Sequence, residues 1–141
     1  MNGSGLATFR EVARNLLRIG AGLLFMQHGV QKLFGWLGGM GGTGEAAAFG
    51  SVYWFAGLIE VFGGLAIVLG IFTQIVALVA AVEMLVAYFW QHLPHGFWPI
   101  QNMGELALLY FLIFLFLVAY GAGAFSLDAR FGRRRGRWPR S

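Results

Sequence analysis

The sequence predicts an all-α integral membrane protein, a four-helix bundle with both termini in the cytoplasm. Hydrophobic residues make up 58% of the 141-residue chain and charged residues 11%, and the mean hydropathy is +0.69. A soluble domain has about 25% charged residues, so this chain has too few to cover a surface exposed to water. Nine of the ten basic residues lie at the two ends of the apolar block. Because cytoplasmic flanks of membrane spans are enriched in Lys and Arg, both ends are expected in the cytoplasm.

Four apolar stretches have the length of a membrane-crossing helix, about 20 residues with a range of roughly 17–25. With both ends on one side the number of crossings must be even, and four crossings meet that condition. A cytoplasmic N-terminal segment, residues 1–15, precedes the transmembrane domain of residues 16–122, and a basic cytoplasmic tail, residues 123–141, follows it. The predicted spans are residues 16–34, 53–69, 73–90 and 103–122.

The two longer connections are expected on the outer side of the membrane. One is a glycine-rich loop of residues 35–52, and the other, residues 91–102, contains Pro94 and Pro99, which are predicted to end the third helix. Aromatic residues gather near these loops, as they do at a membrane–water interface. They are Trp36, Tyr53, Trp54, Trp90, Phe97 and Trp98.

The composition also excludes several kinds of chemistry. The chain contains no cysteine, which excludes disulfides, thiolate catalysis and cysteine-bound iron–sulfur clusters. No short metal-ligand spacing such as HExxH is present, so we predict no metal site. Most of the net charge of +4 comes from the arginine tail beside an apolar span. The expected partner of that tail is therefore anionic lipid, and no nucleic acid is expected.

Three titratable residues on three different helices are predicted at one depth. His28, Glu60 and Glu83 each lie six or seven residues from the outer end of a predicted span, which is roughly 10 Å at 1.5 Å per residue. Lys32 lies one turn above His28, and Glu105 lies near the outer end of the fourth span. A carboxylate at mid-membrane costs about 2.5–3.5 kcal/mol on insertion scales, so such residues normally face the interior of a bundle.

The neighbours of these residues predict which helix faces turn inward. Glu60 shares a face with Gly57 and Gly64, and Glu83 shares one with Ala80 and Ala87. Small residues allow helices to approach closely. On the first span His28, Gln31 and Lys32 share a face. We therefore expect a polar pocket in the outer half of the bundle.

Two further interpretations remain open. The polar residues could only lock the helices together, with Lys32 or His28 paired to a glutamate, in which case the protein is a non-catalytic membrane anchor or assembly partner. The second interpretation is a small proton-coupled transporter. It would need a path to the inner side, and the absence of carboxylates from the inner halves of the spans counts against it. A homodimer formed through the small-residue faces is compatible with either interpretation.

The order of these motifs resembles the DoxX family of small bacterial inner-membrane proteins. The resemblance covers about residues 6–127. It rests on the run from Arg18-Ile19-Gly20 through His28-Gly29-Val30-Gln31-Lys32-Leu33, on Gly57-Leu58-Ile59-Glu60-Val61-Phe62-Gly63-Gly64-Leu65, on Glu83-Met84 and on Glu105. It implies a multi-pass protein of the bacterial inner (plasma) membrane.

The resemblance also implies a redox connection. The family name is tied to thiosulfate:quinone oxidoreductases, and other relatives are linked to oxidative-stress defence in complexes with soluble redox enzymes. Since this chain has no thiol, we do not expect it to oxidise thiosulfate alone. We expect a redox-associated membrane subunit with a quinone-type ligand and a soluble redox enzyme as partner.

The residues receive the following roles in this hypothesis. Glu60 and Glu83 would exchange protons, His28 would bind a quinone carbonyl, and Lys32 would tune the carboxylates electrostatically. Gln31 and Glu105 are additional candidates for binding the ligand.

Overall fold

The computed structural model describes residues 3–135, and these residues form helices and loops without a β-strand. The all-α prediction is therefore confirmed for this part of the chain. The helical elements are α1 (Gly3–Phe34), η1 (Met40–Gly42), α2 (Val52–Leu58), η2 (Ile59–Gly63), α3 (Gly64–Leu69), α4 (Thr73–Ala87), η3 (Tyr88–His92), η4 (Leu93–His95), α5 (Pro99–Asn102), α6 (Glu105–Tyr120) and α7 (Leu127–Arg135).

Within residues 3–135, two continuous helices are long and apolar enough to cross a membrane. They are Val52–Leu69, which joins α2, η2 and α3, and Thr73–His95, which joins α4, η3 and η4. Helix α6 is apolar but has only 16 residues. Helix α1, with 32 residues, is longer than either of the two candidate spans.

Helix α1 begins at Gly3, whereas the sequence predicts that the first span starts at residue 16. No proline interrupts residues 3–15. A salt bridge between Glu11 and Arg14, one turn apart, also supports helix there. Hydropathy reports where a helix is apolar enough for lipid, so it does not detect the polar helical turns that precede the apolar part of α1. The basic tail likewise contains a helix, α7, while Arg137 and Arg140 lie outside the described residues.

The third predicted span continues beyond residue 90. The chain stays helical through the π-helical turn η3 and the tighter 3₁₀ turn η4, as far as His95. Pro94 is tolerated because it occupies the first turn of η4, where its missing N–H is not needed. Gly96, with φ 147°, then ends the helical run.

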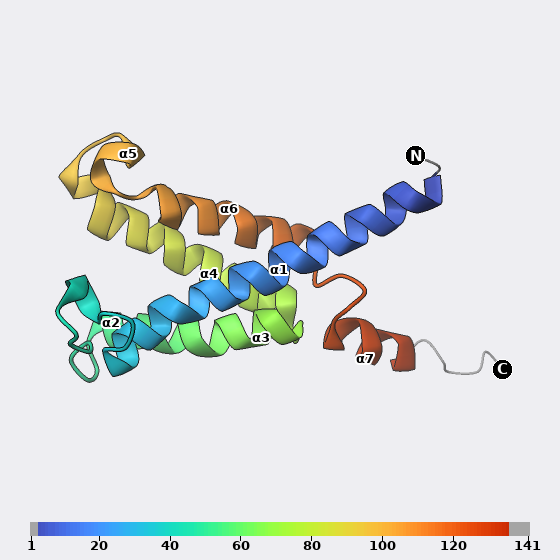
Figure 1. The fold of residues 1–141 in the computed structure, drawn as a ribbon, viewed down its shortest axis with the longest axis horizontal. Helices are drawn as coiled ribbons and strands as arrows, with labels where there is room; N and C mark the ends of the chain where they lie inside the picture. The colour runs from blue at the N-terminus through green and yellow to red at the C-terminus, as the bar shows by residue number, and fades with distance from the viewer. Residues whose placement is uncertain (1–2, 136–141) are drawn as a thin grey trace.

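The helices pack as two groups that run along the long axis of the molecule (Figure 1). Helix α1 packs against α2, η2 and α3, and α4 packs along α6. We call the end with residues 35–51 and 96–104 the loop end, and the opposite end, with the start of α1 and with α7, the termini end (Figure 1). The buried core contains Phe25, Ile67, Ala80, Phe114 and Leu117, each 0% exposed.

Glycines allow α1 to approach its neighbour closely. A Cβ atom on Gly22 would lie 2.9 Å from the Gly64 carbonyl oxygen, and one on Gly64 would lie 2.8 Å from the Gly22 carbonyl oxygen. A Cβ atom on Gly29 would lie 2.7 Å from the Gly57 carbonyl oxygen. Side chains larger than hydrogen at these positions would separate the two helices.

Arg18 ties the two groups together at the termini end. Although it lies near a predicted membrane flank, it is 0% exposed. Its guanidinium donates to the carbonyl oxygens of Ile67 (2.6 Å) and Val68 at the end of α3, and to those of Ala122 (2.8 Å) and Phe125 (2.7 Å) after α6. A cation at these last carbonyls of α3 also complements the helix dipole.

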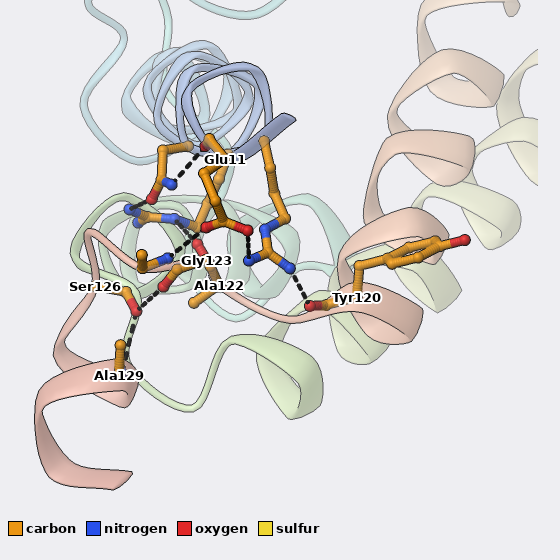
Figure 2. Close-up of polar contacts among 10 residues, drawn as sticks. Glu11, Tyr120, Ala122, Gly123, Ser126 and Ala129 are labelled. Carbon is orange, nitrogen blue, oxygen red and sulfur yellow. Dashed lines mark hydrogen bonds and ion pairs between the residues drawn. The ribbon is translucent and has the colours of Figure 1, made fainter. Parts of the chain in front are cut away.

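The start of α7 closes the same region. The two carboxylate oxygens of Asp128 accept hydrogen bonds from the Phe72 N–H (2.8 Å) and the Thr73 N–H (2.9 Å), at the N-terminus of α4. A carboxylate at a helix N-terminus satisfies free N–H groups and complements the dipole. The chain between α6 and α7 also contacts α1: Arg14 donates to the Tyr120 carbonyl oxygen, and the Ala124 N–H donates to Glu11 (Figure 2).

Candidate functional site

A cavity of about 910 Å³ lies between the two groups of helices, toward the loop end. Helices α1, α2, α4 and α6 and the turns η2 and η3 all contribute to its lining, which is mainly apolar. Four residues predicted as site residues are among the lining: His28, Lys32, Glu60 and Glu83. The other lining side chains include Tyr53, Ala56, Met84, Val86, Trp90, His92, Leu106 and Tyr110.

Glu60 projects from the π-helical turn η2 and is 2% exposed. The Nζ atom of Lys32, on α1, lies 2.6 Å from each of its two carboxylate oxygens. This charge-assisted pair joins α1 to η2 across 28 residues of sequence. Single π-helical turns inside α-helices are often found at functional sites, because the extra residue redirects a side chain.

Glu83, on α4, lines the same cavity. Both of its carboxyl oxygens are buried, and neither has a hydrogen-bond partner among the residues that the structure describes. A buried polar atom without a partner is costly, so an isolated one needs an explanation. An additional group with a donor or an acceptor would satisfy this carboxyl, since it accepts as an anion and donates when protonated.

His28 and Tyr110 meet edge to face on the lining, with ring centroids 5.9 Å apart. Tyr110 is 4% exposed and also contacts Phe25 and Phe114, with centroids 5.6 and 5.7 Å away. Sequence reasoning did not select Tyr110. Its distance from the outer end of the fourth span, counted as for the glutamates, is the signal that could have found it.

Gln31 and Glu105 do not lie among the residues that line the cavity. Gln31 donates its side-chain amide to the Leu37 carbonyl oxygen (3.0 Å), which positions the start of the glycine-rich loop. Glu105 is exposed at the start of α6. Within residues 3–135 no three His, Asp or Glu side chains come together in a group suited to a metal ion.

A second, shallower cavity of about 440 Å³ lies at the termini end, beside Glu11 and Arg14. Glu11 accepts hydrogen bonds from Arg14 and from the Ala124 N–H (3.0 Å), as Figure 2 shows. The bond from Arg14, and next the one from Ala124, lowers the pKa of the Glu11 carboxyl below its ordinary value of 4.5. Both carboxylate oxygens of Glu11 are engaged in these bonds, and the cavity is more open than the first.

The fold and the larger cavity define a small helical membrane protein with an ionisable, mostly apolar cavity. The chain belongs to the DoxX family, a membrane family, because the DoxX model matches residues 13–93. A relative from Haemophilus influenzae is 39% identical over 134 residues, which cover 93% of this chain and 99% of that protein, and its name is "Uncharacterized protein". No solved structure matches the chain.

Proposed function

We propose that this DoxX-family protein is a redox-associated subunit of the bacterial inner membrane that binds a quinone-type ligand in the cavity between its two groups of helices. The observation that carries the proposal is the carboxyl of Glu83. Its oxygens are buried with no hydrogen-bond partner among residues 3–135, within a mainly apolar cavity that also contains the Lys32–Glu60 ion pair and His28. Ligand cavities combine apolar walls with a few polar groups in this way.

The proposed topology has four crossings, with the loop end outside and the termini end in the cytoplasm. Two helices meet the requirements of length and apolarity, and α1 and α6 run beside them along the long axis (Figure 1). The basic residues Arg10, Arg14 and Arg130 belong to elements at the termini end, in agreement with the enrichment of cytoplasmic flanks. Aromatic side chains are exposed near the loop end, among them Trp36, Trp90 and Trp98.

The lining residues fit a ligand with carbonyl oxygens. The ammonium of Lys32 has three N–H groups, and Glu60 accepts from it, so a further bond to a carbonyl is available. His28 and Tyr110, which meet on the lining, can also donate, and Glu83 can give or take a proton. The apolar residues Met84, Val86 and Leu106 would contact the ring and the hydrocarbon tail.

A bound quinone would supply the redox chemistry, because it takes up electrons and protons together. The chain itself contains no cysteine, so we assign the supply of electrons to a soluble redox enzyme that associates with it. Glu60 and Glu83 are the groups that we propose to exchange the protons.

The first test is mass spectrometry and absorbance of protein purified in mild detergent, followed by titration with a short-chain ubiquinone analogue. Trp90 lines the cavity, so binding is expected to quench tryptophan fluorescence. Glu83→Gln should reduce binding while the helical content stays unchanged, since that carboxyl makes no hydrogen bond to a described residue. The matched control is Glu45→Gln, the same change at an exposed residue outside the cavity.

A protein that purifies without quinone from a quinone-rich membrane and does not bind the analogue would overturn the proposal. The alternative is then the membrane anchor for soluble redox enzymes. The Lys32–Glu60 pair favours that alternative, because both its charges are satisfied by each other and it joins two helices without any ligand. In that case Glu83→Gln should change no ligand binding.

A further inference from the structure

The polar groups of the cavity lie on the loop-end side of a continuous apolar layer. Along α1, Phe25 lies one turn toward the termini end from His28, and along α4, Ala80 lies one turn in that direction from Glu83. Along α6, Phe114 follows Tyr110 toward the same end. Ile67 of α3 occupies this part of the core as well. We call Phe25, Ile67, Ala77, Ala80, Phe114 and Leu117 the apolar plug.

The plug is tightly packed. All six of its side chains are 0% exposed and belong to one buried cluster. The Phe25 and Phe114 rings meet edge to face, with centroids 4.8 Å apart, and Tyr110 packs on both rings. A close-packed apolar layer leaves no room for a chain of water molecules.

The next polar side chains beyond the plug do not extend the cavity. Thr73 is buried at the start of α4, ten residues from Glu83, which corresponds to roughly 15 Å along a helix. Arg18 uses its guanidinium on backbone carbonyls and on the Asn15 side chain. Neither residue lines the cavity.

Polar residues and loop residues line the opposite side of the cavity. Ser51 and Gly41 belong to the glycine-rich loop and its junction with α2, and Gln91 and His92 belong to η3. Met103, which is 81% exposed, lies just before α6. These residues belong to the loop end, so the cavity approaches solvent from that end.

From this arrangement we infer that access to the cavity is one-sided: the ligand's polar head and the protons of Glu60 and Glu83 exchange with the aqueous phase at the loop end, and the apolar plug closes the termini end. The inference rests on the proposed function only in treating this cavity as the ligand site. It excludes a through-going transport path. It also assigns any protons consumed or released by the ligand to the loop-end compartment.

Single-cysteine labelling can test this inference cleanly, because the chain contains no cysteine of its own. Right-side-out and inverted membrane vesicles would be treated with a charged, membrane-impermeant methanethiosulfonate. Thr43→Cys in the exposed loop and Thr8→Cys near the start of α1 identify which end each preparation presents to the reagent. These two markers make the result independent of the proposed topology.

The decisive pair of variants makes the same substitution on the two sides of the carboxylates. Ala56→Cys, on the cavity lining, should react only in the vesicles in which Thr43→Cys reacts, and an excess of short-chain quinone should slow its labelling. Ala77→Cys, in the plug, should react in neither preparation.

Labelling of Ala56→Cys from the termini end, from both ends or from neither end would overturn the inference, as would labelling of Ala77→Cys. Protection by quinone is read separately from sidedness. One-sided labelling without protection would retain the inference about access and contradict the proposed ligand. Protection with two-sided labelling would support the proposed ligand and contradict the inference about access.

Discussion

Glu60 and Glu83 line the same cavity from different helices, yet among the described residues only Glu60 has a hydrogen-bond partner for its carboxylate. Both carboxylate oxygens of Glu60 lie 2.6 Å from the Lys32 ammonium, whereas neither oxygen of Glu83 has a hydrogen bond to any described residue. The first carboxylate therefore holds two helices together, and the second is available to a ligand. The two glutamates should respond differently to the same substitution.

The stability of the protein should depend on Glu60 and not on Glu83. Glu60→Gln leaves the Lys32 ammonium in a mostly buried site without its counter-charge, which should lower the free energy of unfolding by about 3 kcal/mol. Glu83→Gln should change it little. The measurement is reversible unfolding in mixed detergent micelles. The double variant Lys32→Met, Glu60→Met should recover most of the loss, and equal effects of the two Gln substitutions would contradict this prediction.

The close contact of α1 with α2 should make Gly29 intolerant of a methyl group. In Gly29→Ala the new Cβ would lie 2.7 Å from both the Gly57 carbonyl oxygen and the Val61 nitrogen, which are backbone atoms that cannot move independently. We expect a loss of about 1–3 kcal/mol, the usual cost of overpacking. The matched control is Gly20→Ala on the same helix, where nothing lies within 4 Å of the new Cβ. That variant should be as stable as the wild type or slightly more so, and similar losses in both would refute the packing argument.

Arg18→Lys should be strongly destabilising although it keeps the positive charge. The guanidinium reaches carbonyls of α3 and of the segment after α6 at once, and a lysine with one nitrogen cannot replace that geometry. Leaving buried carbonyls unpaired costs about 1–3 kcal/mol for each group, so a loss of at least about 2 kcal/mol is expected from thermal or denaturant unfolding. Arg10→Lys, at an exposed position of α1, is the control and should have almost no effect.

The contact between α1 and the segment after α6 should weaken in acid. Hydrogen bonds from Arg14 and from the Ala124 N–H lower the pKa of Glu11 below 4.5. The contact therefore contributes stability above the ordinary carboxyl pKa and is lost as the pH falls through the lower, folded-state value. Protection of the Ala124 amide against hydrogen exchange should decrease in that range, after correction for the intrinsic rate. In Glu11→Gln this protection should be weaker at neutral pH and should not change in acid.

Much of the fold can be predicted from the local sequence. Apolar stretches predict helices at residues 53–69 and 73–90; the structure has them at 52–69 and 73–95, and Gly70 adopts the left-handed conformation that ends α3. The early start of α1 and the helix α7 were not predictable by the same route. Hydropathy measures suitability for lipid, and both segments are helical without being apolar.

Part of the site is also readable from sequence. Counting residues from the span ends predicts that His28, Glu60 and Glu83 lie at one depth, and the structure lines a single cavity with all three. Counting along a helix cannot identify partners across helices. It did not distinguish which glutamate Lys32 pairs with, it included Gln31 and Glu105, which do not line the cavity, and it omitted Tyr110.

Sequence by itself determined the membrane character of the chain and its helical content, because these properties depend on composition and on the length of apolar stretches. Tertiary structure decided that Glu60 pairs with Lys32 while Glu83 has no hydrogen-bond partner in the described part of the chain, and that Arg18 is a buried connection rather than a surface flank. Those outcomes depend on how closely separate helices approach one another. The local pattern indicated which faces carry small residues, but which residues of another helix meet those faces depends on packing between segments dozens of residues apart.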